Sequence, residues 1–370
     1  MTYFWQTDSW PDFTYKLDAS CEKYLYAFAR SAGYVGGLIE GLERRDQTEM
    51  HLQLMVAEAI KTSEIEGEYL NRDDVISSVR NNLGLSAAPV TIGDKRAEGV
   101  AELMIAVRNG YETRLSEAIL FDWHSKLLGW DRRAKVGCWR THEEPMQVIS
   151  GPVGKETVHF EAPPSERVPS EMKRFIRWFN ATMPGEAIEI DKPPIRAALV
   201  HLYFESIHPF DDGNGRIGRA ISEKTLSQGL GRPVVMSLSA AIEADRKSYY
   251  EELKLAQRKR DISAWVSFFL RLCVDAQVQA GEQIRFTLQK ARLFDCFEDR
   301  MNERQIRVVR RMFEEGPDGF EGGMSARKYV SITKASKATA TRDLQGLLEM
   351  GVFRSEGGGR STRYALALDE

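Results

Sequence analysis

One short segment, residues 208–219 with the sequence HPFDDGNGRIGR, constrains the fold of this 370-residue chain more than any other. The residues before it, Pro194–Ile207, are mostly apolar and predict a helix that starts at a proline. The residues after the turn, Arg216–Gln228, predict a second helix. Between the two, Gly213–Gly215 predicts a tight turn, because glycine adopts positive φ and leaves room beside the backbone. The chain must therefore hold two helices whose connection exposes free N–H groups, and such a connection binds anions.

Four side chains of this segment suit the handling of a nucleotide. Arg216 and Arg219 are three residues apart, so they fall on one side of the second helix and can clamp phosphate oxygens in bidentate fashion. Asp212 lies beside the turn, where its carboxylate would repel a phosphate unless a divalent cation bridged the two. His208 offers an imidazole, which accepts a proton near neutral pH. The alternative is a glycine-rich helix–loop–helix turn with solvated arginines.

The segment resembles the signature of the Fic family, HPFx(D/E)GNGRxxR, at every fixed position. Most Fic proteins transfer AMP from ATP to a hydroxyl group of a target protein. The resemblance implies that His208 is the general base, that Phe210 anchors the loop in the core, and that Asp212 holds Mg²⁺. It also implies a set of residues that bind the phosphates: Gly213, Asn214, Gly215, Arg216 and Arg219. ATP, Mg²⁺ and protein hydroxyls are therefore the expected substrate, cofactor and acceptors.

A second segment, Thr62–Gly67 with the sequence TSEIEG, fits the inhibitory pattern of the same family, (S/T)xxxE(G/N). Apolar spacing predicts a helix over Met50–Ile65, with Gly67 near its C-terminal end. The resemblance pairs Glu66 with Arg219, which would remove a phosphate ligand and place negative charge where the γ-phosphate should lie. The alternative is an ordinary solvated glutamate. The place of the motif implies the subclass whose inhibitory helix precedes the catalytic core.

Composition excludes several classes of protein. The net charge of −3 gives no bulk attraction to nucleic acid or to a membrane surface. The four cysteines are widely spaced without a CxxC pair, so neither a zinc site nor a disulfide framework is indicated. The N-terminus lacks a basic stretch followed by an apolar one, so no secretory signal is expected. No stretch approaches the length of a membrane span. We expect a cytoplasmic protein.

Three regions are expected along the chain, and the fold class is mainly α. Residues 1–90 form a helical N-terminal region that contains the inhibitory helix. This region opens with aromatic residues, which we interpret as a packing cap on a helical bundle. Residues 91–285 form the Fic catalytic core, and residues 300–370 form a winged helix-turn-helix domain.

Two features of the expected core lie before the signature. Ser116–Trp130 predicts a helix that contains His124, which we interpret as structural because no nucleotide motif surrounds it. Two strand-like runs, Met146–Gly151 and Thr157–Phe160, flank Gly151–Gly154 and predict a β-hairpin. By resemblance, a hairpin flap at this place holds the target segment by adding a strand to it.

Three residues outside the signature bear on the expected site. The residues after it resemble the family's trailing helices, in which a tyrosine and a polar residue border the adenine. Tyr250 and Gln257 are the candidates, and an aromatic stripe in the core is the alternative. His201 lies seven residues before His208 on the same helix face, and we interpret it as a packed histidine rather than a metal ligand.

The C-terminal region resembles a winged helix in its order of elements. Three helices are expected over Arg304–Glu315, Ser325–Val330 and Ser336–Met350, with Ser331–Thr333 as the turn before the last helix. Short strand-like runs between Val352 and Leu366, around Glu356–Arg360, predict a hairpin wing.

This region is basic, with twelve Lys and Arg against seven Asp and Glu between Arg304 and Leu368. Five helix residues would face a major groove, and two wing residues would lie near phosphates: Lys334, Lys337, Thr339, Thr341, Arg342, Arg360 and Arg363. The region therefore predicts DNA as a partner. The alternative is a winged helix used for protein contacts or for forming a homodimer.

Taken together, the sequence predicts an autoinhibited Fic enzyme that transfers AMP from Mg-ATP to a Ser, Thr or Tyr hydroxyl of a protein and releases pyrophosphate. Within the enzyme class, the rivals are transfer of another nucleotide and removal of AMP from a modified target. Outside it, the rival is a DNA-binding regulator whose Fic core senses nucleotides. An intact His208 favours the enzyme, because sensing needs no base.

Overall fold

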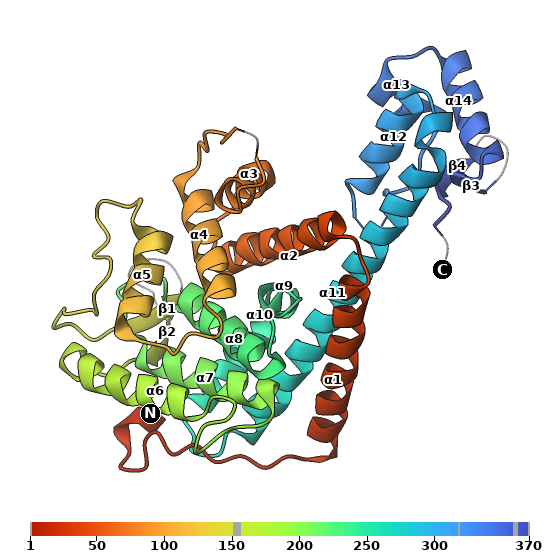
Figure 1. Ribbon diagram of the computed structural model, residues 1–370. Helices are drawn as coiled ribbons and strands as arrows, with labels where there is room; N and C mark the ends of the chain where they lie inside the picture. Colours follow the sequence, from red (N-terminus) through yellow and green to blue (C-terminus); the bar gives the residue numbers. More distant parts are fainter. Residues whose placement is uncertain (1, 87, 151–156, 317–318, 358–361, 369–370) are drawn as a thin grey trace. The chain divides into compact units, whose positions relative to one another are not determined.

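The computed structural model describes residues 2–86, 88–150, 157–316, 319–357 and 362–368. The chain divides into two compact units, residues 1–280 and 281–370. Both units are mainly helical, as the sequence predicts (Figure 1). Within the described ranges, no helix combines the length and the apolar composition that crossing a lipid bilayer would require.

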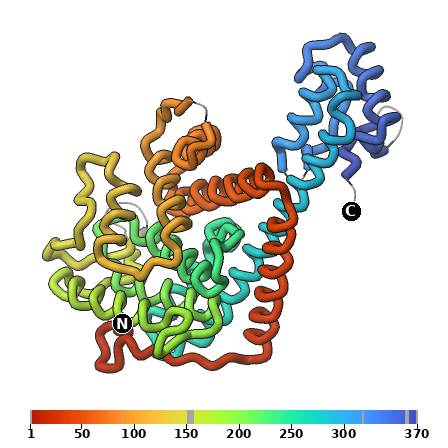
Figure 2. Tube along the Cα trace, viewed as in Figure 1, coloured from red at the N-terminus to blue at the C-terminus, as the bar shows by residue number. Residues whose placement is uncertain are grey.

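The first unit consists of helices, one short hairpin and the start of a long helix. The helices are α1 (Ala19–Glu40), α2 (Arg44–Ile65), α3 (Arg72–Asn82), α4 (Lys95–Asn109), α5 (Glu117–Leu128), α6 (Val168–Ala181), α7 (Pro193–Ile207), α8 (Asn214–Leu230), α9 (Leu238–Ala244), α10 (Arg246–Ala256) and α11 (Ser263–Phe297). The trace in Figure 2 shows a sharp bend between α1 and α2, after which α3 and α4 follow. The helices expected at the inhibitory motif, at Ser116–Trp130 and on both sides of the signature are confirmed, with bounds that differ by a few residues.

Helices α7 and α8 pack against each other in the first unit and determine where the signature lies. Every residue of α7 from Pro194 to Ile207 is buried. Its sequence is mostly apolar, which suits a helix that is covered on all sides. Helix α8 is buried over most of its length and contacts α2, α4, α5 and α9. Two buried helices therefore hold the two ends of the signature loop.

The aromatic residues at the N-terminus cap this bundle, as the sequence predicts. Phe4, Trp5 and Trp10 are buried in the same core cluster as α7 and α8. Trp5 Nε1 donates to the Glu161 carbonyl oxygen at 2.7 Å, and Trp10 Nε1 donates to Glu171 Oε2 at 3.0 Å. Each indole thus buries its ring and still satisfies its N–H group.

The expected hairpin is confirmed as β1 (Gln147–Ser150) paired antiparallel with β2 (Thr157–Glu161). The register shifts between Val148 and Ile149, which marks an irregularity in the ladder. The expected turn over Gly151–Gly154 lies outside the described residues. Two apolar side chains that face each other across the hairpin, Ile149 and Val158, are 53% and 42% exposed.

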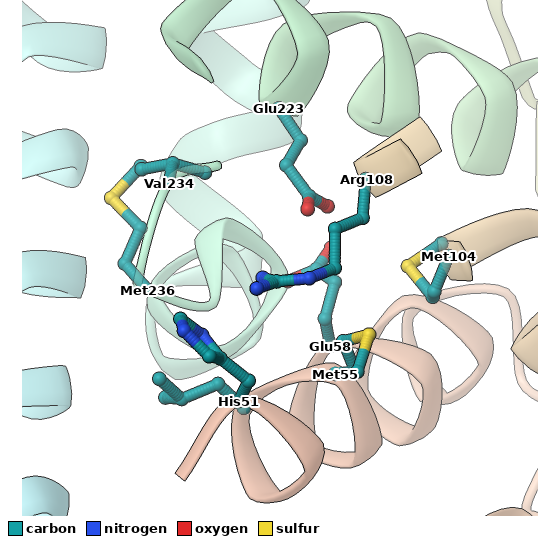
Figure 3. A pocket seen from close by; sticks show the side chains of 9 residues that line it. His51, Met55, Glu58, Met104, Arg108, Glu223, Val234 and Met236 are labelled. Atoms are coloured by element: carbon teal, nitrogen blue, oxygen red, sulfur yellow. The ribbon is translucent and has the colours of Figure 1, made fainter. Parts of the chain in front are cut away.

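A small cavity of about 10 Å³ lies between α2, α4 and α8, too small for an organic ligand. Figure 3 shows the Arg108 side chain extended between Glu223 and His51. Burial, together with the charge of Glu58, raises the pKa of Glu223 to about 8. Glu58 accepts hydrogen bonds from Ser237 Oγ at 2.7 Å and from the N–H group of Ser239 at 3.0 Å, which fixes α2 against the start of α9.

The second unit contains α12 (Glu303–Phe313), α13 (Ala326–Thr333), α14 (Lys337–Glu349) and an antiparallel pair, β3 (Phe353–Glu356) and β4 (Arg363–Leu366). This order of elements agrees with the sequence prediction. The expected turn over Ser331–Thr333 is wrong, because these residues continue α13. The helix ends one residue later, where Lys334 adopts a left-handed φ of 60°. Arg360 of the expected wing lies outside the described residues.

A buried carboxylate ties the three helices of the second unit together. Asp343 of α14 accepts hydrogen bonds from Arg304 Nε at 2.8 Å and from the Tyr329 hydroxyl at 2.9 Å. Asn302, which caps α12, donates to the same carboxylate at 3.2 Å. Burial would raise the pKa of Asp343, but Arg304, Tyr329 and Asn302 together lower it, so the carboxylate stays charged. The angle between α13 and α14 is thereby fixed.

Candidate active site

The signature loop starts at His208, the C-cap of α7, and ends at Gly213, the N-cap of α8. His208 has φ 52°, which is rare for a residue with a side chain. Helix α8 begins at Asn214, two residues earlier than the sequence predicts. The helix starts earlier because the Asn214 side chain closes the loop with two hydrogen bonds. It donates to the Phe210 carbonyl at 2.8 Å and accepts from the Phe210 N–H group at 2.9 Å.

Phe210 anchors the loop in the core, as expected, and is fully buried. It stacks on the ring of His124, with 4.0 Å between ring centroids. His124 Nδ1 accepts from the Gly137 N–H group at 3.2 Å, so Nε2 carries the proton and donates to the Asp212 carbonyl at 3.1 Å. Burial lowers the pKa of His124 and keeps its ring neutral. His124 is therefore structural, as expected, but it holds the signature loop itself.

Arg140 holds the other end of the loop, and no local sequence pattern singles it out. Its Nε donates to the His208 carbonyl at 2.8 Å, and its Nη2 donates to the Ile207 carbonyl at 3.3 Å. The side chain is buried, and burial lowers the pKa of Arg140 to about 10. These contacts satisfy carbonyl groups that the end of α7 leaves free. They also fix the backbone at the candidate base.

The His208 ring lies beside a carboxylate from its own helix. Glu205 Oε2 is 3.5 Å from His208 Nδ1, and the two side chains are 6% and 14% exposed. Glu205 was not a candidate on sequence grounds. It stands one helical turn before His208, a spacing that places both side chains on one face of α7.

Arg219 is paired with Glu66, as the sequence predicts. Arg219 Nη2 lies 2.7 Å from Glu66 Oε1 and also donates to the Thr62 carbonyl at 2.9 Å, while Nε donates to Thr62 Oγ1 at 2.8 Å. Both fixed polar residues of the inhibitory pattern thus hold one buried guanidinium. A Cβ atom at Gly215 would lie 2.3 Å from Glu66 Oε1, so this glycine gives the carboxylate its space. The expected turn at Gly67 has φ 79°.

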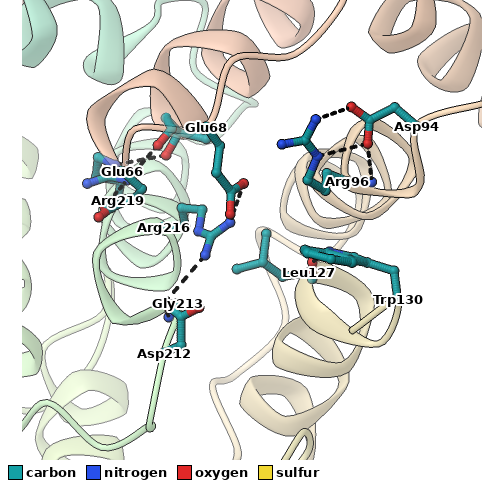
Figure 4. A network of polar contacts seen from close by, with 11 residues as sticks. Glu66, Glu68, Asp94, Arg96, Leu127, Trp130, Asp212, Gly213, Arg216 and Arg219 are labelled. Carbon is teal, nitrogen blue, oxygen red and sulfur yellow. Dashed lines mark hydrogen bonds and ion pairs between the residues drawn. The ribbon is translucent and has the colours of Figure 1, made fainter. Parts of the chain in front are cut away.

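A second carboxylate, that of Glu68, lies two residues after Glu66 and pairs with Arg216 (Figure 4). Arg216 Nη1 lies 2.8 Å from Glu68 Oε2, and Arg216 Nη2 lies 3.6 Å from Asp212 Oδ1. Glu68 stands outside the inhibitory pattern, and the sequence did not single it out. Glu64, which misses the pattern, pairs instead with Lys61 at 2.6 Å.

Asp212 is the residue whose carboxylate suits a divalent cation. Its side chain is 71% exposed, and its Oδ1 accepts from the Gly213 N–H group at 2.6 Å. In the part of the chain that the structure describes, no group of three or more His, Cys, Asp or Glu side chains is placed to hold a metal ion. One carboxylate fits Mg²⁺, which usually takes its remaining ligands from phosphates and water.

The two adenine candidates differ in their surroundings. Tyr250 is 41% exposed on α10, and partial burial together with the charge of Glu66 raises the pKa of Tyr250 to about 12. Gln257 is buried and donates to the Glu205 carbonyl at 3.2 Å, so its amide already has a partner in the fold. His201 is packed, as expected, with Nε2 2.8 Å from the Tyr249 hydroxyl and Nδ1 3.1 Å from Ser222 Oγ.

Residues 114–226 match the model of the Fic/DOC family, and residues 3–85 match a domain of unknown function (DUF4172). The protein adenylyltransferase Fic of Drosophila erecta is 38% identical over 97 residues, which cover 26% of this chain and 18% of that protein. The protein of the same name from Nematostella vectensis is 30% identical over 169 residues, which cover 45% of this chain and 34% of that protein. The chain thus spans about a fifth to a third of the length of these relatives.

Solved structures resemble the fold over longer stretches. A Fic family protein from Desulfovibrio desulfuricans G20 aligns with 95% of this chain and 97% of its own, at a TM-score of 0.57 and 19% identity. Fic-1 from C. elegans aligns with 74% of each chain, at a TM-score of 0.51 and 20% identity. The helical core with its hairpin is therefore a Fic fold. By its matched domain, its named relatives and its fold, this chain contains a domain of the Fic/DOC family over residues 114–226.

Proposed function

We propose that this protein is an autoinhibited adenylyltransferase that transfers AMP from ATP to a Ser, Thr or Tyr hydroxyl of a target protein. The observation that carries the proposal is the loop between α7 and α8, which joins a histidine in a fixed backbone to two buried arginines. The names of the relatives agree with this chemistry. Transfer to a hydroxyl needs a base and a phosphate site, and the loop offers both.

In the proposed reaction, His208 takes the proton of the target hydroxyl. The oxygen attacks the α-phosphorus of ATP, a new P–O bond forms to the target, and the bond from the α-phosphorus to the β-phosphate bridging oxygen breaks. Pyrophosphate leaves and AMP remains on the target as a phosphodiester. Backbone N–H groups at the start of α8, with Arg216 and Arg219, bind the β- and γ-phosphates. The main contribution of the protein is to position the reactants and neutralise charge.

Asp212 would hold Mg²⁺ through its carboxylate. The bound cation would neutralise phosphate charge, which a carboxylate at this place otherwise opposes. The role of the protein is to keep Asp212 in place, through the Gly213 N–H group on its carboxylate and His124 on its carbonyl. Asp212→Ala should weaken the dependence of labelling on Mg²⁺.

The hairpin β1–β2 would hold the acceptor segment by adding a strand to it. An edge strand binds through its backbone, so the target hydroxyl is oriented with little reading of sequence. The exposed pair Ile149 and Val158 supplies apolar surface for the side chains of that segment.

The segment after α2 would keep the enzyme inactive. Glu66 pairs with Arg219, and Glu68 pairs with Arg216. Two carboxylates only two residues apart therefore neutralise both phosphate-binding arginines. ATP could still enter, but its γ-phosphate would meet negative charge and the α-phosphorus would not align for attack. Release of this segment would therefore activate transfer.

The proposal is tested by incubating the wild type, Glu66→Gly and the double variant Glu66→Gly/His208→Ala with α-labelled ATP, GTP, CTP and UTP. We expect label from ATP on protein in Glu66→Gly and none in the double variant. Label transferred from another nucleotide would show that this nucleotide, rather than ATP, is the substrate. Loss of label from a pre-modified target, without any transfer, would favour removal of AMP instead.

For residues 300–370, a winged helix that binds DNA is a second candidate function. The observation in its favour is the exposed face of α14, which carries Lys337, Thr341 and Arg342 on a helix fixed by Asp343. Protein contacts or formation of a homodimer through the same helix are the alternatives, and the salt dependence of binding separates them.

A further inference from the structure

The last turn of α7 carries a buried carboxylate that the proposed reaction does not use. Glu205 is 4% exposed, and its Oε2 lies 3.5 Å from Nδ1 of His208. Glu205 Oε1 and His208 Nδ1 have no hydrogen-bond partner in the part of the chain that the structure describes. Burying a carboxylate oxygen without a hydrogen bond is costly. Its presence here therefore indicates a role toward the ring it faces.

Helix α8 leaves a space that fits this carboxylate. A Cβ atom at Gly218 would lie 2.2 Å from Glu205 Oε1 and 3.3 Å from Phe204 Cδ1. Gly218 stands at a variable position of the signature HPFx(D/E)GNGRxxR, so the phosphate site does not require glycine there. In this chain, the absence of a side chain at Gly218 accommodates Glu205.

The groups around the carboxylate leave His208 as its principal partner. Burial would raise the pKa of Glu205, but His208, followed by Arg219, brings it below its usual range. His201 is kept neutral because burial lowers its pKa, and Arg219 is held by Glu66. From α10, the hydroxyls of two tyrosines also face this cluster, and both stay protonated: Tyr249 and Tyr250. On the far side of the loop, Arg140 donates to backbone carbonyls.

We propose that Glu205 is a positioning residue that holds the proton of the His208 ring on Nδ1 and leaves Nε2 free as the base. This inference rests on the proposed function. When the target hydroxyl gives its proton to Nε2, the ring becomes a cation with a proton on each nitrogen. The Glu205 carboxylate stabilises that cation while the oxygen attacks the α-phosphorus and pyrophosphate leaves. A carboxylate that orients a catalytic imidazole through Nδ1 plays the same part in hydrolases.

The test compares Glu205→Gln with Glu22→Gln, an equal change of charge at an exposed position of α1. Both are made in the Glu66→Gly background, so that transfer is measurable. We expect Glu205→Gln to lower kcat by at least about tenfold with little change in KM for ATP. Glu22→Gln should match its parent.

A second measurement needs no activity. In protein labelled with ¹⁵N-histidine, the ring shifts of His208, assigned by comparison with His208→Ala, report which nitrogen carries the proton. We expect Nδ1–H in the wild type and a changed tautomer in Glu205→Gln. Gly218→Ala should give the same change, since alanine displaces the carboxylate while favouring helix. The Gly218→Ala variant also provides the test if Glu205→Gln does not fold.

The outcomes separate the two proposals. An unchanged tautomer in Glu205→Gln and Gly218→Ala would overturn the role of Glu205, whatever the rate of AMP transfer. A changed tautomer in a protein that transfers no nucleotide would support the positioning role and refute the proposed function.

Discussion

Arg219 and Glu66 form an ion pair of 2.7 Å across 153 residues of sequence, with the arginine side chain only 1% exposed. Thr62 binds the same guanidinium through its hydroxyl and its carbonyl. Two of the three guanidinium nitrogens, Nε and Nη2, are therefore occupied while α2 stays in place. Burial alone would lower the pKa of Arg219, but Glu66 raises it, so the guanidinium stays charged and the pair holds at any pH at which Glu66 is ionised.

Glu66→Gly should raise auto-modification by at least about tenfold, the factor that ~1.4 kcal/mol represents, because it frees Arg219 for the γ-phosphate. Labelling with α-labelled ATP measures the change. Glu64→Gly is the matched control, since Glu64 lies on the same turn but contacts Lys61 instead. Arg219→Ala should not mimic activation, because it deletes a phosphate ligand together with the ion pair. Equal labelling by wild type and Glu66→Gly would remove the inhibitory role.

Glu68→Gln should also raise labelling, by less than Glu66→Gly, since it releases Arg216 but leaves Arg219 paired. Exposed ion pairs contribute up to about 1 kcal/mol and partly buried ones more, so a rise of about three- to tenfold is expected. The double variant Glu66→Gly/Glu68→Gln shows whether the two contacts act as one unit. If Glu68→Gln leaves the rates of both parents unchanged, Glu68 takes no part in inhibition.

The sequence predicted the parts of this site that are contained in short patterns. His208, the glycine turn, both arginines and the pairing of Glu66 with Arg219 follow from two motifs, each read over a few consecutive residues. The helices on both sides followed from apolar spacing and from proline and glycine positions.

Two supports of the site could not be predicted, because each reaches the loop from a distant part of the chain. His124 and Arg140 lie far before the loop in sequence, and no local pattern links either to it. Glu205 and Glu68 stand next to recognised motifs but outside their fixed positions. Glu205 faces His208 from the same helix, whereas only the packing of α2 against α8 brings Glu68 to an arginine.

His208→Ala should abolish transfer while ATP binding stays within about twofold of the parent, because the imidazole acts on the target hydroxyl and not on the phosphates. Isothermal titration with a non-hydrolysable ATP analogue measures binding, and labelling of lysate proteins measures transfer. The Glu66→Gly background is used for both. Labelling near the parent level in the histidine variant would contradict the role of His208 as base.

Glu223→Gln should change how stability depends on pH. Burial raises the pKa of Glu223 to about 8, whereas an unfolded glutamate ionises near 4.3. The folded state thus keeps a proton that the unfolded state has released, and the stability linked to Glu223 is lost as pH rises toward 8. Relative to wild type, the glutamine variant should gain about 1–3 kcal/mol between pH 5 and pH 8. Urea unfolding at both pH values measures this, and parallel pH dependences would contradict it.

If α14 enters a major groove, binding of the 370-residue protein to DNA should weaken steeply with salt, because each phosphate neutralised by Lys or Arg releases counterions. Lys337→Gln/Arg342→Gln should then reduce the slope of log K against log salt by about two. Labelling by the catalytic core should stay unchanged, since these residues belong to the other compact unit. Glu349→Gln, at the end of the same helix, should not weaken binding.

Gel-shift titration at two salt concentrations, with light scattering on the same samples, distinguishes DNA binding from protein contacts. No shift at low salt, together with a change of mass in the double variant, would make α14 a protein contact and would rule out the DNA-binding regulator.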